Sequence, residues 1–405
     1  MSRSPNDVVI LTAVRTPLCR ARRGALAKIP PSTLLSTVLR GCIPPSIPPS
    51  CIEDICVGNV LAPASGYAMA RMAQIDAGIP YTTPLQTLNR QCSSGLQAMN
   101  VIATAIASGQ IKVGIGCGVE SMSSHPMNKV TPPDVDWEVM KEDRNSEAMN
   151  CLIPMGVTSE NVSSKFGFTR SQLDEFATIS HQRASLAQQS GKFSEEIIPV
   201  EGVTADDGIR AQTTPAILSK LKPVFDPENG STTAGNSSQM TDGAAAILLT
   251  TRAHAAHLQL PILGVYRHFS VVGVPPSIMG IGPAVAIPKL LNDAGVNTED
   301  VELYEINEAF ASQAKYCIEV LGLDTNKVNV NGGAIALGHP LGCTGARLTV
   351  SLLHEMKRRG VHNRGKEGGG TAGRRLGVVS MCIGTGMGAA ALLEVEDGPW
   401  RQSSL

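Results

Sequence analysis

"EDICVGNV" (residues 53–60) opens a pattern that occurs twice in the chain: an apolar run, a glycine-containing turn with a helical stretch, and then "KVGIGCGVE" (112–120). The same order is found in "ELYEINEA" (302–309), "GGAIALGHPLGCTGARLTV" (332–350) and "LGVVSMCIGTG" (376–386). Apolar runs separated by helical stretches are typical of α/β layering with buried sheets. The repeat therefore predicts an α/β fold with two similar halves.

The stretch between these halves departs from the pattern. It contains proline-rich and polar segments such as "SSHPMNKVTPPDVDWE" (123–138), and long insertions outside the core are often functional. We therefore expect an N-terminal half at 1–121, completed by about 245–270, and a C-terminal half at 271–405. Residues 122–244 are expected to form an inserted lobe over the active site.

Composition excludes several classes of protein. With 405 residues and 42% hydrophobic residues the chain can bury more than one core, and 17% charged residues is too few for a solvated, disordered chain. The net charge of −1 implies no bulk attraction to nucleic acid or to an anionic membrane. The charge-free run 376–393 is long enough to raise the question of a membrane span, but its four glycines favour two buried strands joined by a tight turn.

The ten cysteines include no CxxC pair, and no secretory leader precedes them. Most are therefore expected to be buried, reduced thiols of an intracellular protein. Because no His/Cys cluster has the spacing of metal ligands, we expect no metal site.

Cys92, in "LNRQCSSGLQAMN" (88–100), stands where a helix begins. Ser93 and Ser94 are placed near the helix cap, and the residues from Leu96 onward have helical apolar spacing. The unpaired N–H groups and the helix dipole would stabilise a thiolate at this position. A cysteine at a helix start is only modest evidence of catalysis by itself.

Two later stretches supply partners for that thiol. His339 lies in a glycine-dense turn before another helix, where it has little value for core packing and would serve as a base. Cys382 ends a buried strand and opens a Gly-x-Gly turn, whose N–H groups would stabilise an oxyanion on a substrate carbonyl.

Long motifs in a fixed order then resemble the thiolase family, from about residue 8 to residue 395. They are "NRQCSSGLQA", "CGVESMS", "GNSSQMTDGAAA", "NEAFA", "GGAIALGHPLGCTGAR" and "CIGTGMG". Within the family they are most similar to the peroxisomal 3-ketoacyl-CoA branch of acetyl-CoA acyltransferases. The resemblance implies a layered α-β-α-β-α fold and thiolytic cleavage of 3-ketoacyl-CoA in fatty-acid β-oxidation.

The resemblance also implies a role for each matching residue. Cys92 would take the acyl group as a thioester, and His339 would activate it and help to hold the substrate thioester oxygen. Cys382 would be the second acid/base. Asn307 would position a water beside His339 in one oxyanion hole, and the N–H groups of Cys92 and Gly384 would form the other.

Coenzyme A is implied as a co-substrate, with no permanently bound cofactor. Ser238, Ala234, Met155 and Phe310 would contact the pantetheine arm, and Arg210 and Phe225 would lie near the adenine-phosphate end. Met155, Phe310 and Phe225 fit ordinary core packing equally well, and Arg210 fits a solvated surface charge. Acetoacetyl-CoA-specific relatives tend to have histidine where this chain has Pro154, which favours medium- to long-chain substrates over acetoacetyl-CoA synthesis from two acetyl-CoA.

Two other functions use related folds. A ketoacyl synthase would have histidine or asparagine in place of Cys382, and a non-catalytic lipid-carrier or CoA-binding module would not need Cys92, His339 and Cys382 together.

The resemblance implies a peroxisomal location. A cytoplasmic location stays open as the alternative, because the usual import segment of the family is missing and the final "SSL" matches "SKL" poorly. The family assembles as homodimers or pairs of dimers, and 361–375 is expected to be a surface loop, with a phosphate cradle as its alternative.

Overall fold

The computed structural model describes residues 3–129, 133–363 and 374–396. Its strands form a ten-stranded sheet in the order β4-β3-β5-β6-β1-β7-β10-β9-β8, with β2 paired to β6. The strands are β1 (Val8–Arg15), β2 (Cys19–Arg20), β3 (Asp54–Gly58), β4 (Leu85–Leu88), β5 (Val113–Ser121), β6 (Thr241–Thr251), β7 (Gly264–Gly273), β8 (Val301–Ile306), β9 (Arg374–Ile383) and β10 (Met387–Glu396).

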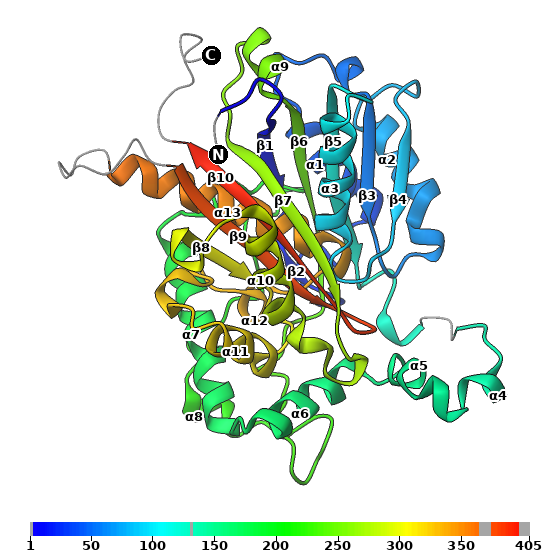
Figure 1. Ribbon diagram of the computed structural model, residues 1–405, viewed down its shortest axis with the longest axis vertical. Helices are drawn as coiled ribbons and strands as arrows, with labels where there is room; N and C mark the ends of the chain where they lie inside the picture. The colour runs from blue at the N-terminus through cyan, green and yellow to red at the C-terminus, as the bar shows by residue number, and fades with distance from the viewer. Residues whose placement is uncertain (1–2, 130–132, 364–373, 397–405) are drawn as a thin grey trace.

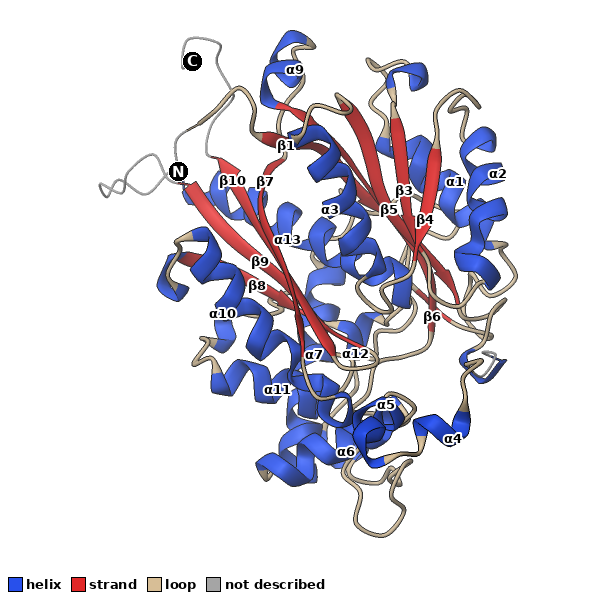
Figure 2. Ribbon diagram, turned by 45° about the vertical axis from the view of Figure 1, so that its right-hand side comes forward, coloured by secondary structure: helices blue, strands red, loops and turns tan. Residues whose placement is uncertain are grey.

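The sheet consists of two halves with the same strand order. In the first half β3 is parallel to β5, and β5, β6 and β1 follow as antiparallel neighbours. In the second half β8 is parallel to β9, and β9, β10 and β7 follow in the same way. The halves meet where β1 pairs briefly with β7. The predicted repeat is thus confirmed in the fold (Figure 2).

Helices cover both half-sheets and fill the space between them (Figures 1 and 2). The central layer contains α3 (Ser94–Ala107) and α13 (Leu341–Asn363), whose apolar side chains share one core with both half-sheets. The outer face of the first half is covered by α1 (Pro31–Cys42) and α2 (Tyr67–Asp76), and that of the second half by α10 (Gly282–Ala294). This is the predicted α-β-α-β-α layering.

The remaining helices are short or belong to the connection between β5 and β6. That connection contains α4 (Trp137–Met140), α5 (Ser146–Asn150), α6 (Met155–Phe166), α7 (Arg170–Gln189) and α8 (Pro215–Leu218). Outside it are α9 (Arg252–His257), α11 (Ala311–Val320) and α12 (Ala334–Leu337). In Figure 1, α4 and α5 project from the lower part of the molecule, and α6 and α8 lie below the second half.

The strand pairing bears on where the halves divide. β6 belongs to the first half-sheet, as expected of a segment that completes it, whereas β7 pairs along its length with β10. We therefore propose that the N-terminal half ends before Gly264 rather than near residue 270.

The segment 361–375 was expected to be a surface loop, but only its middle lies between regular elements, because α13 continues to Asn363 and β9 begins at Arg374. Residues 364–373 between them, and the C-terminal "SSL", lie outside the described residues.

Glycines allow the two central helices to approach each other through their backbones. A Cβ atom on Gly95 of α3 would lie 2.6 Å from the carbonyl oxygen of Gly342 in α13, and one on Gly345 would lie 2.5 Å from the backbone nitrogen of Leu96. A Cβ on Gly118 of β5 would overlap the same carbonyl of Gly342. The N-terminal ends of α3 and α13 are thereby held against each other, and this contact positions the site.

We predict that Gly118→Ala lowers the free energy of unfolding by about 3 kcal/mol or more, because rigid backbone atoms must move to admit the methyl group. Gly273→Ala is the matched control, since its Cβ would meet nothing within 4 Å and lies on β7 of the same sheet. Urea denaturation followed by circular dichroism measures both. Equal midpoints for the two variants would contradict the proposed backbone contact.

Candidate active site

A strained turn presents Cys92 at the start of α3. The preceding residue, Gln91, has φ of 46°, a conformation that is costly outside glycine and is common at functional sites. Ser93 and Ser94 hold this turn, because their hydroxyls donate to the carbonyls of Arg90 and Gln91 at 3.0 and 2.6 Å. They make no side-chain cap to the helix N–H groups, so the predicted capping role is corrected to one of fixing the turn.

The Cys92 thiol is buried, with 3% of its surface exposed. Burial raises its pKa to about 11, although hydrogen bonds from the N–H groups of Gly384 and of Cys92 itself favour the thiolate. Backbone N–H groups at the site favour the thiolate, in the expected direction, but burial opposes them. Desolvation outweighs the helix end, and the nucleophile is stored as a neutral thiol.

The backbone of His339 is fixed by the segment that leads into β6, and its side chain contacts Asn307. Its backbone N–H lies 3.1 Å from the carbonyl of Gln239 and 3.2 Å from Oγ1 of Thr241, and Gly338 before it has φ of 101°. The imidazole Nε2 lies 3.4 Å from Nδ2 of Asn307. Burial lowers the pKa of His339 to about 3, assisted by the positive charge of Arg347. The histidine is thus neutral at rest, and it can hold a proton only where negative charge develops beside it.

Thr344 selects the tautomer of that base. Its hydroxyl lies 2.6 Å from Nδ1 of His339 and donates to the carbonyl of Pro340 at 3.2 Å, which leaves a lone pair to accept the Nδ1 proton. Nε2 then is unprotonated and accepts a long hydrogen bond of 3.4 Å from the Asn307 amide. Sequence reasoning missed Thr344, although its place five residues after His339 at the start of a helix was a usable signal.

Cys382 ends β9 beside the hairpin that leads into β10. Thr385 (φ 68°) and Gly386 (φ 91°) make this turn left-handed, and a Cβ on Gly384 would lie 3.7 Å from Oε1 of Gln91 in the Cys92 turn. Burial raises the pKa of Cys382 well above its ordinary value, so this second thiol is also protonated at rest. Its apolar neighbours are Met279, Ala309, Met155 and Phe310.

Symmetry explains where these groups come from. Cys92 precedes α3 and His339 precedes α13, which are the equivalent helices of the two halves. Cys382 pairs with Gly388 on β10 as Glu120 pairs with Gly243 on β6. Glu120, which sequence reasoning also missed, accepts the N–H of Gly342 at 2.9 Å and those of Val60 and Leu61 at 3.1 Å. This carboxylate ties the turn of His339 to the first half.

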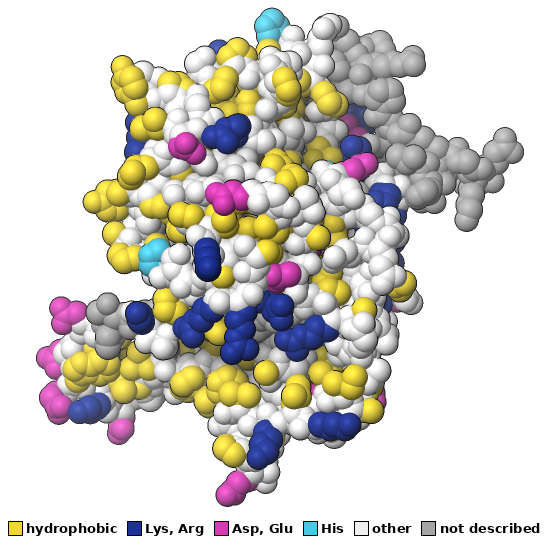
Figure 3. Space-filling view, turned by 180° about the vertical axis from the view of Figure 1, so that it is seen from behind, with side chains coloured by type: hydrophobic (Ala, Val, Ile, Leu, Met, Phe, Trp, Pro, Cys, Tyr) yellow, Lys and Arg dark blue, Asp and Glu magenta, His cyan; other side chains and the backbone are white. Residues whose placement is uncertain are grey.

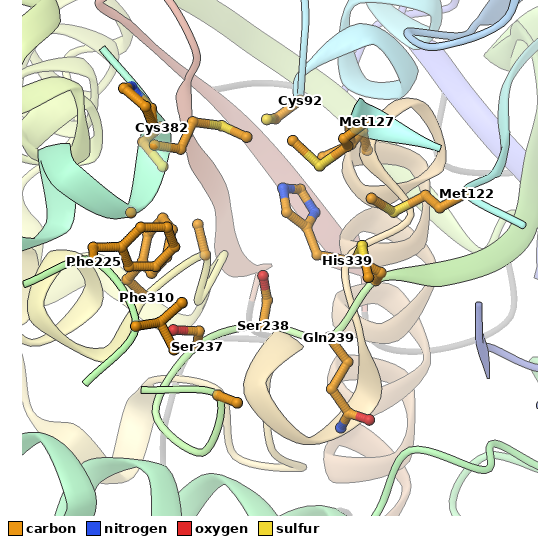
Figure 4. A pocket seen from close by; sticks show the side chains of 18 of the residues that line it. Cys92, Met122, Met127, Phe225, Ser237, Ser238, Gln239, Phe310, His339 and Cys382 are labelled. Carbon is orange, nitrogen blue, oxygen red and sulfur yellow. The ribbon is translucent and has the colours of Figure 1, made fainter. Parts of the chain in front are cut away.

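The three groups meet in a cavity of about 410 Å³. Figure 4 shows Cys92, His339 and Cys382 converging on it, with Met122 and Met127 on the side of Cys92 and with Phe225 and Phe310 on the side of Cys382. Of the residues predicted to bind coenzyme A, Ser238, Ala234, Met155, Phe310 and Phe225 line this cavity. Pro154 does so too.

Three of the residues predicted for the site, Asn307, Gly384 and Arg210, do not line the cavity. Asn307 is completely buried and reaches the site through His339, and Gly384 reaches it through its N–H group toward Cys92. Arg210 is exposed and does not line the cavity, and its backbone N–H donates to Nδ1 of His181 at 3.2 Å.

The lobe reaches the site through backbone pairing. The N–H of Ser238 donates to the carbonyl of Ala309 at 2.9 Å, and Ser237 forms a bridge with Phe310. The Phe225 ring lies directly over Gly156, where a Cβ would overlap it. Two segments of the lobe and one of the second half thus build one wall.

Neither a membrane span nor a metal centre is apparent in the part of the chain that the structure describes. None of its helices combines the length and apolar character needed to cross a bilayer, and the run 376–393 forms parts of β9 and β10. Nor do three or more His, Cys, Asp or Glu side chains of these residues gather where they would hold a metal ion. All ten cysteines are free.

Comparisons with known proteins bear on this geometry. The family model "Thiolase, N-terminal domain" matches residues 8–253, and "Thiolase, C-terminal domain" matches residues 260–395. The chain is 52% identical to 3-ketoacyl-CoA thiolase A, peroxisomal, of Rattus norvegicus, covering 96% of this chain and 89% of that protein. The human peroxisomal 3-ketoacyl-CoA thiolase is 52% identical over 96% of this chain and 91% of its own. The resemblance predicted from the motifs is thereby confirmed.

Solved structures agree. The dimeric peroxisomal thiolase of Saccharomyces cerevisiae superimposes with a TM-score of 0.90 at 45% identity, over 98% of this chain and 99% of that one. Human mitochondrial 3-ketoacyl-CoA thiolase in complex with CoA gives 0.84 at 34% identity, over 96% and 98% of the two chains. A further yeast structure is described as five-layered and built from two core domains of identical topology, which is the arrangement found here.

We predict that alkylation of Cys92 by iodoacetamide accelerates about tenfold per pH unit between pH 7 and 9, because the pKa of about 11 keeps the thiolate fraction small over this range. The Cys51→Ser background removes the exposed thiol, and peptide mass spectrometry isolates the reaction at Cys92. A rate that levels off below pH 9 would show that the thiolate is already formed at rest.

Thr344→Val should lower kcat about tenfold, the equivalent of one hydrogen bond of about 1.4 kcal/mol, because the unwanted tautomer of His339 becomes populated. Thr344→Ser keeps the hydroxyl and should retain most of the activity. The initial rate of Cys92 acylation against pH is the readout, with thermal unfolding as a check on folding. Indistinguishable acylation by the two variants would remove the role assigned to the hydroxyl.

Proposed function

Because the chain belongs to the thiolase family, we propose that its site cleaves 3-ketoacyl-CoA with a second molecule of CoA, giving acetyl-CoA and an acyl-CoA shortened by two carbons. The observation that carries this proposal is the meeting of two buried thiols and one neutral imidazole in a single apolar cavity. This is the acetyl-CoA acyltransferase reaction of fatty-acid β-oxidation, and the curated relatives that match this chain are peroxisomal enzymes. The protein is accordingly placed in peroxisomes.

In the first half-reaction Cys92 becomes acylated. His339 takes the thiol proton at Nε2 while Sγ attacks the keto carbon, C3, of the substrate. The C2–C3 bond then breaks, C3 becomes the carbonyl carbon of a thioester on Cys92, and the electron pair passes to the acetyl-CoA enolate. Cys382 donates its thiol proton to C2, and acetyl-CoA leaves.

The second half-reaction restores the site. The Cys382 thiolate takes the proton of the incoming CoA thiol, whose sulfur attacks the acyl carbonyl. The Cys92 sulfur departs and recovers its proton from His339. The chain thus ends each cycle with both thiols protonated, and the order of events is ping-pong.

Two sets of donors stabilise the developing oxyanions. N–H groups of Cys92 and Gly384, both directed at the Cys92 sulfur, serve the oxygen on the carbon that Cys92 attacks. Protonated His339, with a water held by Asn307, serves the thioester oxygen of the enolate. The Oδ1 atom of Asn307 is buried without a protein partner, and this supports the water-holding role. Negative charge on the enolate also stabilises an imidazolium that burial alone disfavours.

Coenzyme A fits the wall built by the lobe. Ser238, Ala234, Met155 and Phe310 are placed for the pantetheine arm, with Phe225 farther along and 41% exposed. Figure 3 shows a band of Lys and Arg side chains across the face opposite to that of Figure 1. The exposed Arg210 would supply positive charge for the phosphates of CoA. No permanently bound cofactor is required by these steps.

A homodimer is supported by the exposed edge of the first half-sheet. β4 ends the strand order, and beside it α2 and the residues after it expose Tyr67, Met72, Ile75 and Tyr81 by 53–76%. An open strand edge flanked by apolar side chains is suited to pairing with a second copy. The yeast neighbour at 45% identity is dimeric.

Substitution of each thiol tests the mechanism. With a 3-ketoacyl-CoA and CoA, Cys92→Ser should abolish acylation of the peptide that contains residue 92. Cys382→Ser should still accept an acyl group from a simple acyl-CoA, because His339 remains to activate Cys92, while overall cleavage falls by about 10²–10⁴.

Exchange of the α-protons of acetyl-CoA in deuterated water, followed by NMR, separates the two roles. Cys382→Ser should exchange poorly, because a serine hydroxyl is no base near neutral pH. If this variant exchanges at the wild-type rate, or loses acylation as fully as Cys92→Ser, the division of labour between the thiols is wrong.

A further inference from the structure

The active-site cavity has two apolar walls that belong to different cores. Cys382 packs with Met279, Ala309, Met155 and Phe310. Cys92 instead shares its core with Met122 and Leu341, and Met127 packs against that core from the side. All of these residues line the same cavity. In Figure 4, Met122 and Met127 lie beside Cys92 and His339, across the cavity from Phe225 and Phe310.

In the proposed reaction the two parts of the substrate lie against different walls. Pantetheine and the acetyl carbon occupy the side of Cys382, since Cys382 must reach C2. The acyl chain stays attached to the Cys92 sulfur while acetyl-CoA departs and free CoA enters. That chain therefore needs space which pantetheine does not fill, and the wall of Cys92 borders such space.

This second wall runs from the interior to the surface. Met122 is 2% exposed, Met127 is half-buried in the short turn Met127–Lys129, and Met240 is 47% exposed. Met122 and Met240 adjoin, because Sδ of Met122 accepts the N–H of Thr241 at 3.3 Å.

The segment Ala21–Arg22 holds the rim together. The N–H of Ala21 donates to the carbonyl of Met240 at 2.9 Å. Arg22 binds the other side, with its N–H 2.6 Å from Oγ of Ser123 and Nη2 3.4 Å from Oδ1 of Asn128. The two strips of chain that carry the methionines are thus fixed side by side.

We infer that Met122, Met127 and Met240 form the acyl-chain subsite, with Met127 and Met240 at the opening through which longer chains leave the cavity. The inference rests on the proposed function and adds which residues set the chain-length range. Methionine is unbranched and has three rotatable side-chain bonds, so a wall of three methionines adapts to chains of different length. Short acyl groups contact only Met122, whereas long ones must pass Met127.

Two substitutions at the rim test the subsite, measured as kcat/KM for 3-ketoacyl-CoA substrates with acyl chains of about 4, 8, 12 and 16 carbons. Met127→Trp should lower the value for the two longest substrates about tenfold or more, because one misfit in an apolar pocket costs about that factor. The shortest substrate should change less than about threefold. Met127→Ala should raise KM for the long substrates only, because it removes apolar contact without blocking the path.

Leu186→Trp is the matched control, since Leu186 is 66% exposed on α7 and does not line the cavity. It should leave the whole length profile unchanged, and circular dichroism should report the same fold for all variants. Losses of equal size at every chain length for both Met127 variants, or no loss at any length, would overturn the inference.

Failure of the proposed function would look different. In that case the unaltered enzyme would cleave none of the substrates and would form no acyl adduct on Cys92 with any of them. Cleavage by the unaltered enzyme together with a length-independent effect of Met127 would reject only the subsite.

Discussion

The contact between the starts of α3 and α13 is the constraint on which the active site depends. Gly95 and Gly345 on the helices, with Gly118 on β5, bring backbone against the Gly342 carbonyl and its neighbours without side chains between them. Each helix follows directly on a turn that carries a reactive group. Because the helix ends touch, a thiol from one half and an imidazole from the other face the same space.

The two similar halves place reactive groups at equivalent positions, but the residues at those positions differ. The equivalent positions before the two helices carry Cys92 and His339, and the equivalent strand ends carry Glu120 and Cys382. One half therefore contributes the nucleophile and a carboxylate that binds backbone, while the other contributes both proton-transferring groups. Burial raises the pKa of Glu120 to about 7, yet three N–H groups occupy it, so its task is to hold the two halves in register.

Much of the fold and the reactive triad could be predicted, because both depend on local patterns. Buried strands and helix starts leave runs and glycine turns in the sequence, and Cys92, His339 and Cys382 lie inside such motifs. The protonation of the thiols could not be predicted, since it is set by their burial in cores that residues distant in the sequence build together. The tautomer set by Thr344 likewise depends on a geometry that spacing alone does not show.

Storing the nucleophile as a buried thiol also determines how the resting enzyme meets oxidants. Burial raises the pKa of Cys92 to about 11, so the thiol is almost entirely protonated near neutral pH, and only 3% of the residue is exposed. Conversion of a cysteine to sulfenic acid requires thiolate and access, and the resting enzyme offers little of either. Peroxides and electrophiles are thus disfavoured relative to the substrate, whose reaction in the cavity develops the negative charge that stabilises the imidazolium of His339. The high pKa of Cys92 thus helps the enzyme to react with its substrate in preference to other electrophiles.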